Sequence, residues 1–371
     1  MNRMFKLDCV GYLIFALIVL VVMPAMVGFG GYELNTYSRY LALGMVTAAV
    51  ALSWGQAGIL NLGQALTFGV GAYFTAMHLK LKASASLPGG LPDFMGWTNV
   101  EALPWFWIPF HSFAFTLSAV IFVPAAIAGL LGVFMFRGRV TGVFVAIITL
   151  SLMLAVQLWI ISEQGWTGGE NGITGLAPLS VFGFSLDPYT VTFYYITASL
   201  LILVLGLALL VVKSKAGLVL RAIRENPDRA RFFGYDVSRY ETIVFAMSAA
   251  MSGLAGMIYC LVLEFASPTY MGLSLSLAMV IWAAVGGRES VVAAALGGIA
   301  VNMAEGQLSD LFLDQWTLIL GVIFIAVVLF LPRGIFGVVD QLRQRLYERR
   351  SSPPAIKADS LTTRKTSQQE G

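Results

Sequence analysis

The chain has 371 residues, of which 58% are hydrophobic and only 12% are charged. A soluble domain has about 45–50% apolar and about 25% charged residues, so this composition excludes an ordinary soluble enzyme and a disordered protein. The formal net charge of +3 argues against a nucleic-acid binder. The two cysteines, Cys9 and Cys260, lie in or beside apolar runs and indicate neither a disulfide framework nor a metal site.

Ten apolar runs along the chain predict an all-α polytopic membrane protein with about ten transmembrane helices. A membrane-spanning helix needs about 20 apolar residues, because about 30 Å of hydrocarbon is crossed at 1.5 Å per residue. The runs cover residues 10–29, 40–55, 59–79, 111–136, 140–162, 190–212, 241–262, 271–286, 291–304 and 316–332. The eighth and ninth are short and are separated only by Gly-Arg-Glu-Ser, which allows two tilted helices or two half-helices.

The two ends of the chain differ from this membrane domain, which we place at 10–337. Residues 1–9 predict a short cytoplasmic N-terminus, and the basic residues and polar composition of 338–371 predict a largely disordered tail. Residues 1–29 also have the order of a signal peptide. Because the apolar run is long and no good cleavage site follows it, we expect a retained first helix.

Lysine and arginine residues predict the orientation. With the N-terminus inside, 20 of the 23 basic residues fall on the cytoplasmic side, and only Arg39, Lys80 and Lys82 fall outside. The positive-inside rule then predicts that both termini are cytoplasmic, N-in and C-in. The long outer loops would be 80–110, with tryptophans typical of an interfacial belt, and 163–189.

Motifs of catalysis are absent from the sequence. It contains no G-x-x-x-x-G-K-[ST] phosphate-binding loop, so the chain is not its own P-loop ATPase, and no HExxH, CxxC or G-x-S-x-G. His78 and His111 sit near outer helix ends, where interfacial anchoring explains them better than catalysis. Glu264, just past the outer end of the seventh run, is the only candidate carboxylate within the membrane runs, which weakens the case for an ion-coupled carrier.

The longest inner loop, 213–240, reads KSKAGLVLRAIRENPDRARFFGYDVSRY. Residues 217–224 predict a short helix, which Asn226-Pro227 interrupts. A second short helix is expected at 228–233, with Gly234 as its C-terminal cap. Positive-inside topology alone would explain the basic residues. We favour a docking element, because two exposed Phe residues, mixed charge and Pro/Gly punctuation exceed what topology requires.

The segment from Arg221 to Tyr235 resembles the coupling loop of the branched-chain amino acid and urea family of ABC importer permeases. Three further stretches agree with the family: Trp54-Gly-Gln-Ala-Gly-Ile-Leu-Asn-Leu-Gly-Gln, Thr167-Gly-Gly-Glu-Asn-Gly-Ile-Thr and Val280-Ile-Trp-Ala-Ala-Val-Gly-Gly-Arg. The resemblance extends from about residue 40 to 337. Together these motifs are specific to the family, whereas each alone is weak.

Within the family, two segments are most similar to the urea-importing branch and to the second permease subunit of that importer. They are Leu91-Pro-Asp-Phe-Met and Leu103-Pro-Trp-Phe-Trp. The chain departs from its relatives at Ser276-Leu277-Ala278, where they usually have an acidic residue, and at Glu289, where they usually have glycine. The lost acid weakens any substrate or gating role for that position, and with it the assignment of the substrate.

The resemblance implies a type II-like permease subunit in the bacterial inner (plasma) membrane, which imports urea or short amides for nitrogen uptake. It implies four kinds of partner: a second homologous permease, two cytoplasmic ATP-binding subunits, a periplasmic solute-binding protein and membrane lipid, with no nucleic acid. ATP would be bound by the partner subunits, so we expect no enzyme activity, cofactor or metal in this chain. The implied coupling residues are Arg221, Arg224, Glu225, Asn226, Arg229, Arg231, Phe232 and Gly234.

A path for urea should offer amides and hydroxyls rather than net charge. Asn61, Gln64, Phe68 and Gly71 share one face of a helix, by their spacing. The candidate translocation path is therefore Asn61, Gln64, Phe68, Thr149, Gln157 and Asn302. Interhelical hydrogen bonding, at about 0.6 kcal/mol each, is the other explanation for each of these polar residues.

The outer Gly-rich loop is a candidate docking site for the binding protein, because glycine allows close backbone approach. Its residues are Thr167, Gly168, Gly169, Asn171 and Gly172. A plain flexible outer loop explains it almost as well.

Three other functions remain open. A branched-chain amino acid permease would have the same architecture, with helix ends to bind a carboxylate. A passive channel for small neutral solutes would not need the inner docking element. A membrane-embedded enzyme lacks any catalytic constellation in the sequence.

Overall fold

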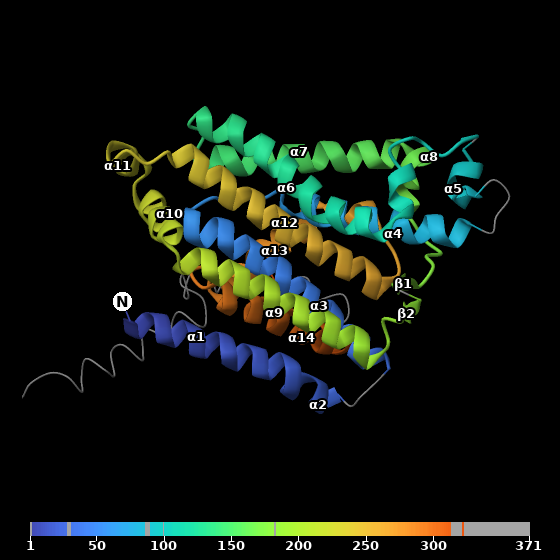
Figure 1. The fold of residues 1–371 in the computed structure, drawn as a ribbon, viewed down its shortest axis with the longest axis horizontal. Helices are drawn as coiled ribbons and strands as arrows, with labels where there is room; N and C mark the ends of the chain where they lie inside the picture. Colours follow the sequence, from blue (N-terminus) through green and yellow to red (C-terminus); the bar gives the residue numbers. More distant parts are fainter. Residues whose placement is uncertain are drawn as a thin grey trace, which may run out of the picture.

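In a computed structural model that describes residues 2–27, 31–85, 90–98, 100–181, 183–312 and 321–322, the chain is a bundle of helices (Figure 1). Most of the long elements run nearly parallel or antiparallel to one another (Figure 1). In the first half they are α1 (Asn2–Leu17), η1 (Ile18–Val22), α2 (Met23–Val27), α3 (Tyr32–Val50), the π-helical η2 (Ala51–Gln56), α4 (Gln64–Ser84), α6 (Phe113–Arg137) and α7 (Val143–Ser162). In the second half they are α9 (Val191–Lys213), α12 (Val237–Leu263), α13 (Leu273–Gly286) and α14 (Val291–Phe312).

Short elements connect the long helices. They are α5 (Asp93–Gly96), η4 (Ile108–His111), α8 (Gln164–Thr167), η5 (Gly169–Asn171), α10 (Lys215–Glu225), α11 (Pro227–Phe232) and η6 (Pro268–Met271). An antiparallel hairpin of β1 (Leu179–Val181) and β2 (Phe184–Leu186) pairs Ser180 with Ser185.

Helices occupy the first nine of the predicted apolar runs, whereas the tenth, 316–332, and the tail from 338 lie outside the described residues apart from 321–322. Within the described part of the chain, four helices are long and apolar enough to cross a membrane: α6, α7, α9 and α12. The bent pair α13–α14 makes a fifth if it counts as one span. Ten crossings therefore stay a prediction.

α3 and α4 form the centre of the bundle together with α12. Polar residues such as Asn35, Ser38 and Gln64 are buried in these helices, and protein rather than lipid surrounds them. Burial in protein explains why the hydropathy of α3 and α4 is lower, and why neither is among the four candidate spans although the apolar runs 40–55 and 59–79 predict one in each. It also explains why α3 begins well before the predicted run at 40–55.

α13 and α14 turn back on each other, with an angle of 116° between them. The turn between them is residues 287–290. The two helices pack through glycine, because a Cβ on Gly297 would collide with the backbone of Gly286. The short eighth and ninth runs are thus two separate helices rather than one straight helix.

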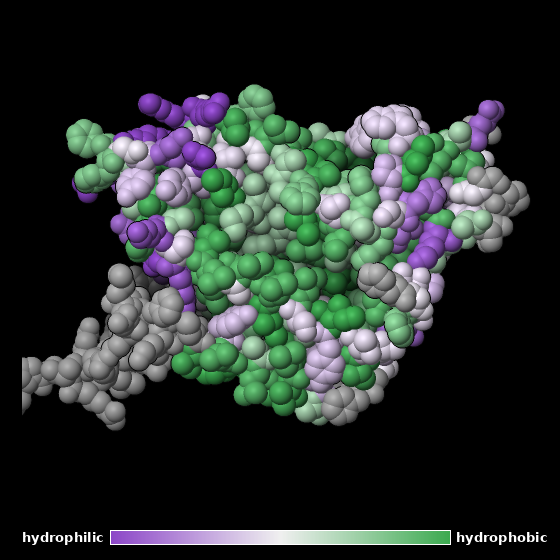
Figure 2. Space-filling view, in the orientation of Figure 1, coloured by the Kyte–Doolittle hydropathy of each residue, from purple (hydrophilic) through white to green (hydrophobic). Residues whose placement is uncertain are grey.

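The molecule has two polar ends and an apolar middle. The start of α1 and the pair α10–α11 lie at one end, and α5, α8 and the β-hairpin lie at the other (Figure 1). Hydrophilic residues gather at both ends of the visible face, with hydrophobic residues between them (Figure 2). This distribution suits a protein whose helices are surrounded by lipid and whose ends face water.

Candidate functional site

The inner loop forms two short helices, α10 and α11, as the sequence predicts. The Ser214 hydroxyl caps α10 by accepting from the amide of Ala216 at 3.1 Å. Asn226 ends α10 and caps α11, because its side-chain oxygen accepts from the amide of Arg229 at 2.9 Å, and Pro227 occupies the first turn. Gly234 follows at φ +85°, a left-handed conformation that glycine adopts freely. We call α10, Asn226 and α11 the elbow.

The elbow is held to α12 by a small apolar core. Ile223 of α10, Ala230 of α11 and Val237 of α12 are buried together. Two aromatic rings point away from this core, since Phe232 is 91% exposed and Phe233 is 78% exposed. An exposed Phe pair on a folded elbow is an apolar surface that suits a protein partner.

The predicted coupling residues fall into two groups. Glu225, Asn226, Arg229, Phe232 and Gly234 are exposed. Arg231 is part-buried and pairs with Asp228 at 2.8 Å. Arg221 and Arg224 are also part-buried, but they bind this chain instead: the Arg221 guanidinium donates to the carbonyl of Val212 at 3.2 Å and the Arg224 guanidinium donates to the carbonyl of Gly55.

Arg224 joins the elbow to two turns at the same end of the bundle. Its Nη1 lies 3.9 Å from a carboxylate oxygen of Glu289. The two turns also bind each other, through the Gln56 amide, which donates to the carbonyl of Glu289 at 2.8 Å, and through Arg288, whose guanidinium carbon lies 4.7 Å from the Trp54 ring centroid. We call residues 54–56 and 288–289 the inner turn cluster. The elbow is therefore attached to both α3–η2 and α13–α14.

Asn61 and Gln64 lie together in the centre of the bundle, both buried. The Asn61 amide donates to the side-chain oxygen of Gln64 at 2.7 Å, and the Asn61 oxygen accepts from the amide of Gly63 at 2.9 Å. The Gln64 amide donates to the carbonyl of Ser248 on α12 at 3.2 Å. In this conformation the pair serves interhelical hydrogen bonding, while Asn61 also lines a narrow gap that Thr149 of α7 lines from the other side.

The remaining predicted path residues are dispersed. Phe68 is buried against Tyr259, with ring centroids 5.2 Å apart. Gln157 is part-buried further along α7, near Gly272. Asn302 donates to the carbonyl of Gly298 on its own helix at 2.8 Å. The structure thus brings together Asn61, Gln64 and Thr149, but it separates them from Gln157 and Asn302.

The outer Gly-rich loop is folded against its own chain. Thr167, Gly168, Gly169 and Gly172 are buried, whereas Asn171 is exposed. A Cβ on Gly172 would collide with the carbonyl oxygen of Ala266, and one on Gly168 would collide with Gly172 itself. The glycines therefore have an internal packing role, and only Asn171 of this set has an exposed side chain for a partner.

Several residues of these sites escaped the sequence analysis. Ser248 is one of them: its hydroxyl donates to the carbonyl of Ala49 at 2.7 Å and joins the Gln64 network. Glu241 is buried in the second turn of α12, whereas Glu264 is exposed, so the expectation that Glu264 is the only candidate carboxylate within the membrane runs is wrong. The sequence feature that could have identified Glu241 is its position at the start of the apolar run 241–262.

The sequence is similar to a known family of transport proteins along most of its length. Residues 32–328 match the family model described as branched-chain amino acid transport system / permease component. The high-affinity branched-chain amino acid transport system permease protein LivM of Salmonella typhimurium is 26% identical over 351 residues, which cover 87% of this chain and 74% of that protein. LivM of Escherichia coli is 25% identical over the same shares.

A shorter match adds the probable branched-chain amino acid transport permease protein LivH of Methanocaldococcus jannaschii, 31% identical over 45% of this chain and 53% of that protein. No solved structure matches the chain at a significant level. The family model covers well over half of the sequence and includes the elbow, the inner turn cluster and the Asn61–Gln64 pair. The chain therefore belongs to the branched-chain amino acid transport permease family of ABC transporters.

Proposed function

We propose that this chain is the translocating permease subunit of an ATP-driven importer, paired with a second homologous permease and served by two cytoplasmic ATPase subunits and a periplasmic solute-binding protein. The single observation that carries the proposal is the elbow. It is a folded element with an exposed Phe pair, and it is bonded through Arg224 to both inner turns.

The elbow offers a route from ATP to the helices. A partner that holds Phe232 would move α10 and α11, and Arg224 would carry that movement to the inner turn cluster. The Ile223–Ala230–Val237 core would carry it to α12. Nucleotide at one end and the loaded binding protein at the other would then bias one two-state element.

A branched-chain amino acid is the first candidate solute. The relatives named above are permeases of branched-chain amino acid systems. The amino end of α4 at Gln64 lies at the buried amide pair, and a helix N-terminus favours a carboxylate. Urea is the second candidate, favoured by residues 91–95 and 103–107 and by the uncharged polar groups around Asn61.

The coupling proposal is tested with Phe232→Asp and Arg224→Ala in the full importer. Phe232→Asp removes an exposed apolar contact, so we expect it to lower co-purification of the ATPase at least tenfold. Arg224→Ala keeps the exposed surface, so we expect normal ATPase binding but several-fold less solute imported per ATP hydrolysed. Phe184→Asp, at a Phe that is 77% exposed at the opposite end, is the matched control. Wild-type co-purification and uptake in both elbow variants would contradict the proposal.

The solute is tested by uptake of radiolabelled leucine and radiolabelled urea, with an active and an ATPase-dead partner. We expect leucine uptake that depends on ATP. ATP-dependent urea uptake without leucine uptake would assign the chain to the second candidate. Solute uptake that is the same with the active and the ATPase-dead partner would indicate a passive channel.

A further inference from the structure

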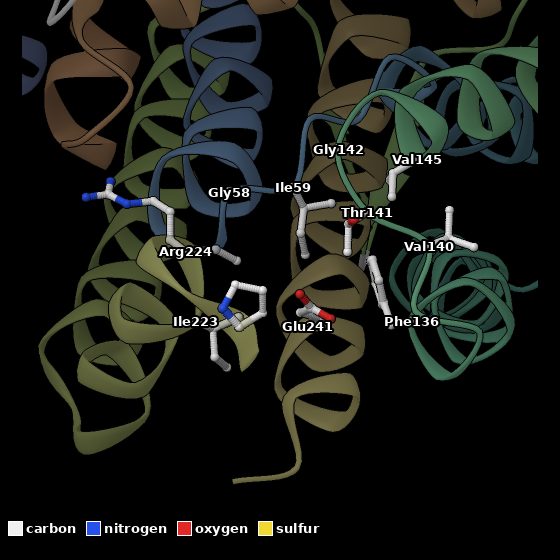
Figure 3. A pocket seen from close by; sticks show the side chains of 12 residues that line it. Gly58, Ile59, Phe136, Val140, Thr141, Gly142, Val145, Ile223, Arg224 and Glu241 are labelled. Carbon is white, nitrogen blue, oxygen red and sulfur yellow. The ribbon is translucent and has the colours of Figure 1, made fainter. Parts of the chain in front are cut away.

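A cavity of about 170 Å³ lies between the elbow and the start of α12 (Figure 3). Ile223 and Pro227 of the elbow form one wall, and Phe136 and Val145 form the opposite one. Thr141, in the exposed connection between α6 and α7, lies at its edge. The cavity therefore combines apolar side chains with the polar groups of Thr141, Arg224 and Glu241, borders the surface and directly adjoins the proposed docking element.

The carboxylate of Glu241 points into this cavity (Figure 3). The side chain is only 6% exposed. Across the described part of the chain, the Glu241 carboxylate has neither a hydrogen bond nor an ion pair. The cation that lines the cavity, Arg224, turns its guanidinium away toward Gly55 and Glu289, and the nearby Arg231 is paired with Asp228.

A largely buried carboxylate without a hydrogen-bond or ion-pair partner is costly, because it loses most of its hydration without gaining a partner. The cavity is far larger than the space that one water molecule needs. Apolar wall residues beside one carboxylate without a partner suit a lysine or arginine side chain, whose aliphatic stem packs on the apolar surface while its charged end binds the carboxylate. The position beside the elbow indicates where such a side chain would come from.

We propose that the cavity is a receptor site for one basic side chain of the ATPase subunit, with Glu241 as its ion-pair partner. The site adds a charged contact to the apolar contact of Phe232, from the other side of the elbow. The inference rests on the proposed function, since it needs a protein bound at this end of the bundle. It also gives Glu241 a role that differs from those of Arg221 and Arg224, which bind this chain.

The test uses Glu241→Gln in the permease pair reconstituted with its two ATPase subunits. The substitution keeps the shape and removes the charge. We expect the dissociation constant of the ATPase subunits to rise at least tenfold. Glu241→Lys should weaken binding further, by repulsion. Glu264→Gln, the same change at an exposed position of the opposite end of α12, should leave the dissociation constant within twofold.

The unfolding temperature distinguishes a binding role of Glu241 from a structural one. Because Glu241→Gln removes an unpaired buried charge, the permease without its ATPase should unfold at the same or a higher temperature than wild type. A variant that lost both stability and ATPase affinity would overturn the inference, and so would a variant with wild-type affinity.

A thiol probe gives a second, independent measurement. The thiol introduced by Glu241→Cys, in a Cys9→Ser background, should react with a cationic methanethiosulfonate reagent in the permease pair. Bound ATPase subunits should slow that reaction at least tenfold. Unchanged labelling would overturn the inference while leaving the proposed function intact. Failure of the wild-type permease pair to bind the ATPase at all would instead overturn the proposed function.

Discussion

Gln64 shows how a polar residue in a membrane bundle can be committed to structure. Its amide oxygen accepts from Asn61, its amide nitrogen donates to the Ser248 carbonyl, and its own carbonyl accepts from Ser252 at 3.2 Å. These bonds connect α4 to α12. A passing solute would have to break one of them to bind, so a transport role for this pair requires a second conformation of the bundle.

Replacing the Gln64 side chain distinguishes a structural role from a role in binding the solute. We expect Gln64→Leu to lower the free energy of unfolding by about 1–3 kcal/mol, because the Asn61 and Ser248 groups lose a buried partner. Asn302→Leu is the control, since among the described residues Asn302 bonds only within its own helix, and its replacement should cost a few tenths of that. Thermal unfolding in detergent measures both. A fall in uptake without any fall in the unfolding temperature would show that Gln64 acts on the solute rather than on the fold.

The helices of the elbow can be predicted from nearby residues in the sequence, whereas contacts between residues far apart in the sequence cannot. Asn226-Pro227 and Gly234 are read directly from the sequence, and both helices of the elbow follow from them. The direction of Arg224 depends on Gly55, which is 169 residues away, so no local pattern contains it. The predicted helix face shared by Asn61 and Gln64 is wrong, because α4 begins at Gln64 and Asn61 lies in the connection before it; a side-chain hydrogen bond joins the two instead. The distance of Asn302 from them depends on the turn between α13 and α14.

Close packing of helices is a further property of elements. α4 crosses α12 at glycine, where a Cβ on Gly256 would collide with the carbonyl oxygen of Phe68. We expect Gly256→Ala to destabilise the protein by about 1–3 kcal/mol, because the helices must separate to admit the methyl group. Gly129→Ala in α6 is the control, since its Cβ would meet only Ala246 at an ordinary 3.8 Å and should gain up to about 1 kcal/mol in helix propensity. Equal unfolding temperatures for the two variants would contradict this packing.

The whole molecule is a multi-pass inner-membrane protein with two chemically distinct ends. The elbow and the start of α1 share one end, and the β-hairpin lies at the other (Figure 1). The buried Lys80, on the far side from the elbow, is neutralised locally: its ammonium lies 2.9 Å from a carboxylate oxygen of Asp93 and donates to the Thr174 carbonyl at 2.7 Å. The two connections at that end are thereby tied to α4.

The orientation of these ends is open to direct measurement. We expect Ala222→Cys, on the exposed side of α10, to react with a membrane-impermeant maleimide only in inverted vesicles. Ser185→Cys, on the β-hairpin, should react in intact spheroplasts, because the positive-inside rule places the hairpin outside. A Cys9→Ser background and a detergent-solubilised sample control for background and accessibility. Labelling of both sites from the same side would refute the predicted orientation.

Direct backbone contact between α4 and α12 also has a mechanical meaning. Gly71 of α4 meets Gly253 of α12, and Gly256 meets Phe68, with no side-chain layer between the two backbones. Packed helices shear by small sliding movements, and the close backbone contacts between these two oppose such sliding. The elbow joins this body through Val237, and Arg224 binds the turn that precedes α4. We therefore expect a push at the elbow to displace α4 and α12 together, with any alternation of access around the pair, where α6, α7 and α13 border it.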